Sequence, residues 1–270
     1  MTENSSLTAK GTNFELRGVS KRKALIFVHG LGLNKAMWQW LPKELEEEFT
    51  VVTYDLFGHG ESLLPETEPS LRMFSLQIRE LMYHCGFNQI ILAGFSLGGM
   101  IVRKFAQDFP ETVEGLMIFN SPHTRSKEQQ ASIEARVTLS KKFGPTATVS
   151  AAIKRWFTEE FEQENPATIN KIKDWIVSND PSIYPKIYKI LAYDLEEIIK
   201  PQPPINCPTL VMTADQDYGN NPEMSKEIAN EIEKSQLCIL RNLKHMALVE
   251  DPSQCGYILR SFLRQFLETE

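Results

Sequence analysis

The sequence predicts an α/β protein built on a mostly parallel sheet with helices on both faces. Short apolar runs alternate with segments of helical spacing from residue 23 to residue 120, and the alternation returns after residue 207. Most of these runs are continuously apolar, which is typical of strands buried on both faces. Strands and helices that alternate in this way form βαβ units, whose strands are parallel. Functional groups are therefore expected in the loops at the carboxyl ends of the strands.

Five strands are expected in the first part of the chain, with helices between them. The first strand alternates in polarity and ends on a glycine, which is typical of a short edge strand. Helical spacing covers residues 34–49, 70–85 and 97–109, and Asn34 is a suitable N-cap for the first of these segments. The expected strands are FELRG (14–18), KALIFVHG (23–30), TVVTYDL (50–56), QIILAGF (89–95) and VEGLMIFN (113–120).

The alternation stops between residues 121 and 206, where no buried strand is apparent. Four segments of helical spacing follow one another there, and a stiff proline-rich stretch, KPQPPINCP, leads back to two further strands. We therefore expect an α/β core in two parts, residues 1–120 and 207–270, interrupted by a helical cap at residues 121–206. The helical segments are 127–143, 146–163, 166–179 and 185–199, and the returning strands are TLVMTAD (209–215) and QLCILRNL (236–243).

Composition excludes several classes of protein. The chain has 270 residues, 42% of them hydrophobic, and a net charge of -6, which argues against nucleic acid or anionic membrane as a partner. The 4 cysteines lack metal-ligand spacing, so we expect reduced thiols and no metal. The N-terminal stretch MTENSSLTAKG has no apolar segment of a signal peptide, and no apolar run could span a membrane. A cytoplasmic protein is expected, with Lys21-Arg22-Lys23 as an exposed turn.

Ser96 is the candidate nucleophile. It lies in Gly94-Phe95-Ser96-Leu97-Gly98, which matches G-x-S-x-G between a buried strand and a helix. A turn this sharp leaves no room for side chains two positions away on either side, so glycines are needed there. The helix that follows directs its positive N-terminal end at the serine. The alternative is a glycine-rich turn without chemistry.

A serine nucleophile needs a positioned base, and His245 is the candidate among the five histidines. It lies in NLKHMALVEDP, directly after a strand and at the carboxyl edge of the sheet. His29 and His59 lie in glycine-rich turns, and His84 lies late in a helix. His123 follows a different strand and is expected to line the pocket instead.

The third member of a catalytic triad orients the imidazole and stabilises its charged form. Asp215 and Asp217 both follow the strand TLVMT, and Asp217 lies further out along that loop. Asp217 is therefore the expected acid, with Asp215 as the fallback and more suited to bonding the loop backbone. A second loop could also carry the acid, but its position holds Asn120.

Acyl transfer also needs backbone N–H groups aimed at the developing oxyanion. Leu97, the residue after the nucleophile, and Leu31, in HGLGLN, are the expected donors; the alternative for HGLG is a tight strand end. Aromatic residues near these loops and in the cap are candidates for lining an apolar pocket. The expected substrate-binding residues are Trp38, Phe95, His123 and Trp156.

Four signatures occur in the order of the α/β-hydrolase superfamily, which the chain resembles over about residues 12–120 and 207–268. They are HGLGLN, YDLFGHGES, GFSLGGM and LKHMALVEDP. The resemblance implies an eight-stranded sheet with the helical cap inserted after the sixth strand, and its acid-loop pattern favours Asp217. The stretches HGLGLNKAMWQW and VVTYDLFGHGES are most similar to 3-oxoadipate enol-lactonases and general carboxylesterases, although Phe57 stands where many relatives carry arginine.

This resemblance implies a serine hydrolase that cleaves an ester or lactone of a small to medium, largely apolar substrate through an acyl-serine intermediate. No metal or cofactor is expected. One alternative is a ligand-binding signalling or regulatory protein of the same fold with slow turnover. Another is a lyase or cofactor-free oxygenase that uses the same triad. The sequence leaves the oligomeric state open.

Overall fold

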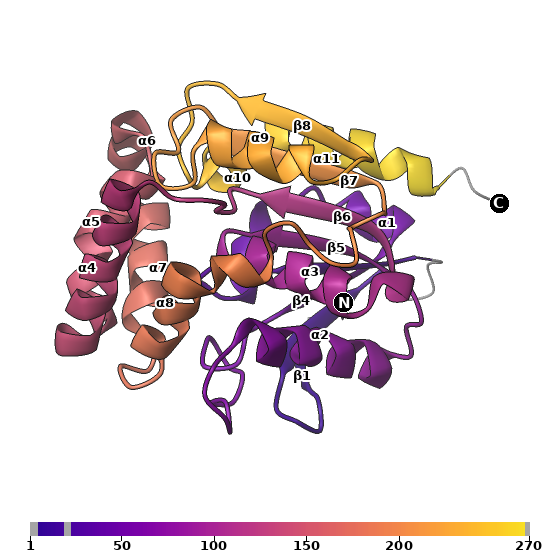
Figure 1. The fold of residues 1–270 in the computed structure, drawn as a ribbon, viewed down its shortest axis with the longest axis horizontal. Helices are drawn as coiled ribbons and strands as arrows, with labels where there is room; N and C mark the ends of the chain where they lie inside the picture. The colour runs from indigo at the N-terminus through magenta and orange to yellow at the C-terminus, as the bar shows by residue number, and fades with distance from the viewer. Residues whose placement is uncertain (1–4, 19–22, 268–270) are drawn as a thin grey trace.

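An eight-stranded sheet runs through the computed structural model, which describes residues 5–18 and 23–267 (Figure 1). Its strands lie in the order β1-β2-β4-β3-β5-β6-β7-β8. The pairs β1–β2 and β2–β4 are antiparallel, and all other neighbours are parallel. The expected eight-stranded, mostly parallel sheet is confirmed. The strands are β1 (Ser5–Leu7), β2 (Asn13–Arg17), β3 (Ala24–Val28), β4 (Thr50–Tyr54), β5 (Ile90–Phe95), β6 (Val113–Phe119), β7 (Thr209–Ala214) and β8 (Ser235–Leu240).

The central strands are apolar at every position because both faces of the sheet are covered. In β3, Ile26 and Val28 belong to the core on one face, whereas Leu25 and Phe27 belong to the core on the other. All four side chains are fully buried. Successive side chains of a strand point to opposite faces, so a continuous apolar run fills both cores at once.

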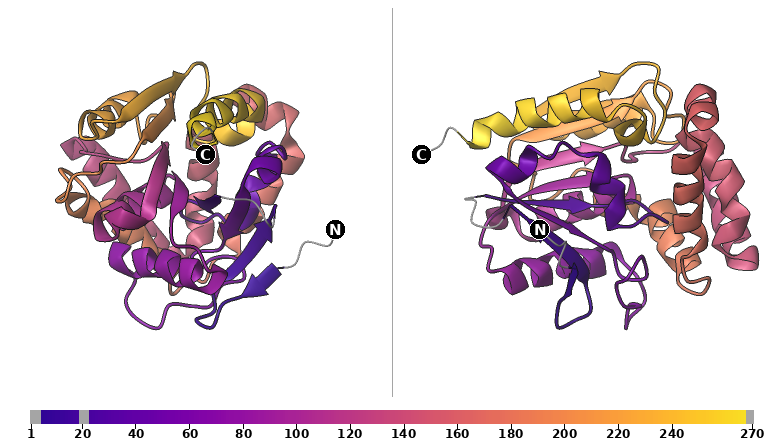
Figure 2. Two further views of the ribbon diagram at one scale, coloured as in Figure 1. Left: turned by 90° about the vertical axis from the view of Figure 1, so that its right-hand side faces the viewer. Right: turned by 180° about the vertical axis from the view of Figure 1, so that it is seen from behind.

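Helices cover the two faces, and Figure 2 shows the sheet between them. The core on one face includes residues of α2 (Leu71–Cys85), α3 (Leu97–Asp108) and α9 (Pro222–Asn230). The core on the other face includes residues of α1 (Leu45–Glu48) and α11 (Pro252–Leu263). None of the described helices is long and apolar enough to cross a membrane. The remaining short elements of the core are η1 (Lys35–Trp40), η2 (Pro110–Thr112), α10 (Ala247–Glu250) and η5 (Arg264–Phe266).

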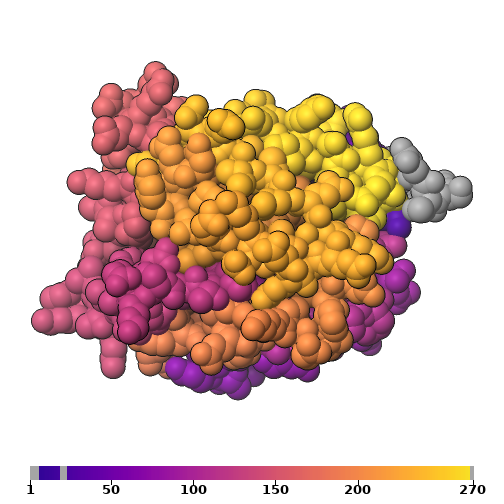
Figure 3. All heavy atoms as spheres, turned by 45° about the horizontal axis from the view of Figure 1, so that its top comes forward, coloured from indigo at the N-terminus to yellow at the C-terminus, as the bar shows by residue number. Residues whose placement is uncertain are grey.

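A helical segment joins β6 to β7, so the insertion after the sixth strand is confirmed. It stands as a separate layer beyond the carboxyl ends of the strands (Figure 1), and it packs against the C-terminal part of the chain on the surface (Figure 3). We call residues 127–197 the helical segment. It contains α4 (Lys127–Phe143), η3 (Pro145–Thr148), α5 (Val149–Trp156), α6 (Glu159–Glu164), α7 (Pro166–Val177), α8 (Tyr184–Tyr193) and η4 (Asp194–Glu197).

Arg103 of α3 ties both ends of the helical segment to the core. Its guanidinium donates to the backbone oxygen of Pro122, before the segment, at 3.1 Å. It also donates to the oxygen of Ile198, after the segment, at 2.9 Å. The side chain is 1% exposed and lies 3.6 Å from Glu231. A buried cation with these partners holds the helical segment in place over the sheet edge.

Three local expectations differ from the structure. The sequence pattern predicted no strand at the residues of β1, although the resemblance implied eight strands. The region expected as one helix at residues 34–49 is divided into η1 and α1 around Pro42, which has no N–H to continue a helix. The segment expected at 146–163 is divided at the extended residue Phe157, after which Thr158 caps α6. Apart from Lys23, the basic run lies outside the described residues, as do the first four residues of the N-terminal stretch.

Candidate active site

Ser96 sits in the sharp turn between β5 and α3. Its φ of 55° and ψ of -112° are a strained conformation for a residue with a side chain. The backbone N–H of Ser96 donates to the oxygen of Phe119 at 2.8 Å, which holds the turn against β6. A Cβ at Gly94 would overlap the carbonyl of Gly98, and one at Gly98 would overlap that of Val28. Both glycines therefore allow the close approach of chain that presents Ser96.

His245 and Asp217 meet in the loops after β8 and β7. The Nδ1 atom of His245 lies 2.7 Å from Oδ2 of Asp217, and Asp217 is only 1% exposed. The imidazole packs against the rings of Phe95 and Trp156, whose centroids lie 4.8 Å and 6.0 Å away. Since Asp217 engages Nδ1, the other ring nitrogen of His245 is the one available to Ser96.

The carboxylate of Asp217 is held by donors from three residues besides His245. Oδ1 accepts the backbone N–H groups of Gly219 at 3.2 Å and Asn220 at 3.0 Å. Oδ2 accepts the side-chain amide of Asn120 at 2.9 Å. Asn120 directly follows β6 and has a left-handed conformation, with a φ of 47°. Sequence reasoning noted Asn120 only as a missing acid, but the structure makes it a partner of the acid.

Asp215 lies apart from the histidine. Its side chain is exposed, and Oδ1 accepts the backbone N–H of Asn242 at 2.8 Å. The structure therefore brings Asp217, rather than Asp215, to His245.

Two buried histidines shape the loop that carries Leu31. His59 accepts the backbone N–H of Gly32 at Nε2, at 3.0 Å, and His29 accepts the N–H of Leu56 at Nε2, also at 3.0 Å. These bonds require neutral rings with the proton on Nδ1. Burial lowers the pKa of His29 to about 4 and that of His59 to about 3. Both rings are therefore fixed acceptors near neutral pH.

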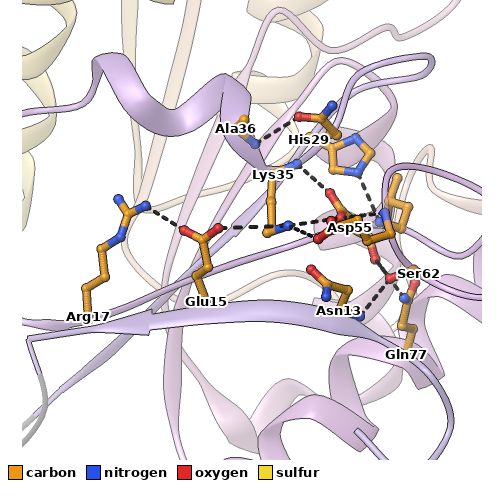
Figure 4. A network of polar contacts seen from close by, with 12 residues as sticks. Asn13, Glu15, Arg17, His29, Lys35, Ala36, Asp55, Ser62 and Gln77 are labelled. Atoms are coloured by element: carbon orange, nitrogen blue, oxygen red, sulfur yellow. Dashed lines mark hydrogen bonds and ion pairs between the residues drawn. The ribbon is translucent and has the colours of Figure 1, made fainter. Parts of the chain in front are cut away.

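Asp55 anchors the far side of the same loop. It accepts the backbone N–H of Lys35 at 2.7 Å, and the Lys35 ammonium lies 3.4 Å from its other oxygen (Figure 4). Burial alone would lower the pKa of Lys35, but surrounding carboxylates, Asp55 foremost, raise it. Ser62 donates to the backbone oxygen of Asp55 at 2.6 Å and accepts the N–H of Asn13 at 2.8 Å. This network fixes the start of η1 and so the turn before it.

Two backbone N–H groups at the site have no acceptor among the described residues. They belong to Leu97, the next residue, and to Leu31, in the loop fixed by the two histidines. Leu97 begins α3, so its N–H is one of the unpaired donors at a helix start.

A cavity of about 380 Å³ opens between these loops and the helical segment. The expected residues Leu31, Phe95, Ser96, Trp156, Asp217 and His245 all line it. No group of three or more described His, Cys, Asp or Glu side chains is placed to hold a metal ion. The other lining residues are Gly30, Leu33, Arg125, Glu128, Gln129, Ser132, Ile133, Arg136, Thr148, Ala152, Arg155, Tyr184, Tyr188, Leu191, Tyr218, Gly219 and Asn220.

Trp38 and His123 do not line this cavity, contrary to expectation. Trp38 is 3% exposed and packs on Phe27, with ring centroids 4.8 Å apart, because η1 turns its apolar side toward the core. His123 lies 3.1 Å from Glu231, beside Arg103 and away from Ser96. The sequence placed both residues after strands that end near the site, but it did not give the direction of their side chains.

Comparisons with known proteins find this chain similar to several hydrolases. A family model described as "alpha/beta hydrolase fold" matches residues 23–144. The chain is 28% identical to 3-oxoadipate enol-lactonase 2 of Acinetobacter baylyi, over 97% of each chain. A thermophilic esterase from Thermogutta terrifontis, solved with malate bound, superposes with a TM-score of 0.86, 25% identity and full coverage of both chains. The enol-lactonase from Burkholderia xenovorans shares the fold, with a TM-score of 0.87 and 21% identity over 97% of this chain and all of that one.

Proposed function

Because this chain belongs to the α/β-hydrolase superfamily, we propose that it hydrolyses a carboxylic ester or lactone through an acyl-Ser96 intermediate. The observation that carries the proposal is that the strained Ser96 and the Asp217-bound His245 line one cavity. The enol-lactonase and the esterase among the similar proteins support an ester or lactone as the bond that is cleaved. The cavity volume suits a small to medium substrate.

Acylation begins with a proton transfer. Nε2 of His245 takes the proton of Ser96 as Oγ attacks the carbonyl carbon, and the carbonyl oxygen becomes an oxyanion. The unpaired N–H groups of Leu31 and Leu97 are the proposed donors to that oxyanion. A donor of this kind is worth about 3 kcal/mol in the transition state of acyl transfer.

Collapse of the tetrahedral intermediate breaks the bond to the leaving oxygen, which takes the proton from His245. With an ester the alcohol departs, whereas with a lactone the new hydroxyl stays attached to the acyl group. A water molecule then attacks the acyl-serine and gives one proton to His245. That proton returns to Ser96 Oγ as the carboxylic product leaves, so both residues are regenerated.

Asp217 stabilises the imidazolium that exists between these steps. Its carboxylate is already fixed by the loop N–H groups and by Asn120, so it need not reorganise when the charge appears on His245. Asn120 is therefore proposed as a positioning residue for the acid.

A panel of p-nitrophenyl esters and simple lactones, varied in acyl length, tests this function. We expect multiple turnovers that fall at least about a thousandfold in Ser96→Ala, as in other triad hydrolases. Ser178→Ala, which changes an exposed serine of the helical segment, is the matched control and should keep full activity. A single burst without turnover would contradict hydrolysis and favour a slow, ligand-binding protein. Undiminished turnover in Ser96→Ala would remove the serine from the mechanism.

A further inference from the structure

Three arginines line the cavity that holds Ser96, on the side of the helical segment. Arg125 lies just before α4, Arg136 lies on α4 and Arg155 lies on α5. Each is half-buried. The mostly apolar pocket expected from the sequence therefore has a strongly cationic wall.

None of these arginines is paired with a carboxylate of residues 5–18 or 23–267. Among the described residues, no carboxylate oxygen lies within 4.0 Å of the nitrogen atoms of their guanidinium groups. Their hydrogen bonds go to uncharged oxygens instead. Arg125 donates to the backbone of Leu191 at 2.8 Å, and Arg136 donates to the hydroxyl of Tyr188 at 3.0 Å. Such bonds orient the guanidinium groups but leave their charge uncompensated.

The charge of Arg136 also disfavours the charges of the other two arginines. Burial, followed by the charge of Arg136, lowers the pKa of Arg125 to about 10. Burial is the main cause of the lowered pKa of Arg155 as well, and the charge of Arg136 adds to it. Arg136 is thus close enough to act on both of the others. Clustered like charges in a half-buried site are costly unless an anion binds among them.

The carboxylates that do line the cavity cannot serve as that anion. Glu128 is exposed and accepts a hydrogen bond from Ser126 at 2.8 Å. Asp217 is close enough to raise the pKa of Arg155 slightly, but its oxygens are engaged by His245, Asn120 and the loop backbone. The described carboxylates therefore leave these charges free to attract an anionic ligand into the cavity.

The remaining lining residues indicate that the bound molecule also has an apolar part. Phe95, Trp156, Ile133 and Leu33 add apolar surface to the lining of the same cavity. A ligand that fits both parts has an apolar stretch with an anionic group on it. The planar guanidinium matches a carboxylate with two parallel hydrogen bonds, so a carboxylate suits this wall.

We propose that the arginines of this wall bind a free carboxylate of the substrate, so that the enzyme prefers esters or lactones that carry one. This inference rests on the proposed function, since it names the substrate class of the same site. The residues assigned to that carboxylate are Arg136, whose charge acts on both other arginines, and Arg155, which also interacts with Asp217.

Paired substrates test the preference. Each p-nitrophenyl hemiester of a straight-chain dicarboxylic acid, from succinic to suberic acid, is compared with its p-nitrophenyl methyl diester, in which a neutral methyl ester replaces the free carboxylate. With spontaneous hydrolysis subtracted, we expect kcat/KM to favour at least one hemiester over its diester by about tenfold or more, the value of a hydrogen bond to a charged group. The chain length at the maximum reports the reach from Ser96 to the arginines.

The preference should depend on the arginines themselves. In Arg136→Gln and Arg155→Gln, the ratio of the two kcat/KM values is expected to fall about tenfold toward one. Lys141→Gln on α4 and Lys154→Gln on α5 are matched controls, because each removes a positive charge from the same helix outside the cavity lining. Both controls should keep the native ratio.

A binding measurement separates this inference from the proposed function. Titration calorimetry of the native protein with the free dicarboxylic acids should show binding that weakens about tenfold in Arg136→Gln and persists in Lys154→Gln. Esters cleaved with equal kcat/KM whether charged or neutral would overturn the carboxylate inference and leave the hydrolase intact. Dicarboxylate binding without turnover of any ester would overturn the proposed function and keep the arginine wall as an anion site.

Discussion

Acidification should weaken the loop that carries Leu31, because two neutral histidines hold it. His59 accepts the N–H of Gly32, and His29 accepts the N–H of Leu56. A protonated ring cannot accept at Nε2, so each ring must lose this bond when it gains a proton. The folded protein therefore disfavours protonation of both residues.

The size of the effect follows from the two pKa values. An unfolded chain takes up protons on both histidines near the ordinary pKa of 6.5, whereas folding lowers the pKa of His29 to about 4 and that of His59 to about 3. The stabilisation is complete above the unfolded value and is lost as pH falls toward the folded values. Between pH 7 and pH 5, linkage gives a loss of about 2 kcal/mol in unfolding free energy for each ring. At pH 5 both folded rings are still neutral, so their mutual repulsion does not enter and the two losses add.

Urea unfolding at a series of pH values measures this. His59→Gln removes one of the two titrations, so its stability should fall about 2 kcal/mol less than that of the native protein between pH 7 and pH 5. Ser62→Ala is the matched control: it breaks bonds in the same network but removes no titrating group, so it should keep the native pH dependence. A native protein and His59→Gln with the same pH dependence would refute the account of the loop.

Three further replacements test the site and its support. Asn120→Ala removes a hydrogen bond to the charged Asp217, so steady-state kcat/KM on the best ester should fall about tenfold or more. Gly98→Ala drives a Cβ into the carbonyl of Val28 and should cost about 1–3 kcal/mol of unfolding free energy in urea. Arg103→Met leaves two backbone oxygens without their buried donor, and should cost on the order of 3 kcal/mol by the same measurement.

Each of these replacements has a matched control variant that should change activity or stability little. Asn206→Ala changes an exposed asparagine and should leave kcat/KM unchanged. Gly219→Ala places a Cβ no closer than 3.6 Å to another atom, and Arg79→Met alters a half-exposed arginine, so both should stay near native stability. Equal effects in the tested and counterpart variants would contradict the roles assigned to the buried groups.

The order of the core elements could be predicted because the central strands are buried on both faces. A short apolar run such as that of β3, in which Leu25 and Ile26 fill opposite cores, is typical of such strands. β1 could not be predicted, since its three residues Ser5–Leu7 carry no apolar pattern and depend on pairing with β2. The break at Phe157 was also hidden, because helical spacing continues through it.

The sequence anticipated which loops would meet, but it did not give side-chain directions. Asp217 could be preferred over Asp215 from its place in the loop, and the structure puts it against His245. Trp38 and His123 were assigned to the pocket from their positions after strands in the same way. Their side chains instead contact Phe27 and Glu231, respectively.

The helical segment was the least predictable part of the site. Its helices have amphipathic spacing that shows which side is buried, but it does not show which residues face Ser96. Arg136 and Arg155 read as ordinary charges on helices in the sequence. Their assembly in one cavity depends on how α4 and α5 pack together. Only the folded structure shows that Arg136, Arg155 and His245 line the same cavity.

Trapping the intermediate tests the central claim most directly. The native protein is mixed with its best p-nitrophenyl ester, quenched in acid during turnover, and the digested peptides are weighed by mass spectrometry. We expect a peptide heavier by the acyl group, with the modification on Ser96 and no such species in Ser96→Ala. An acyl group on another residue, or sustained turnover with no acylated peptide, would contradict the claim.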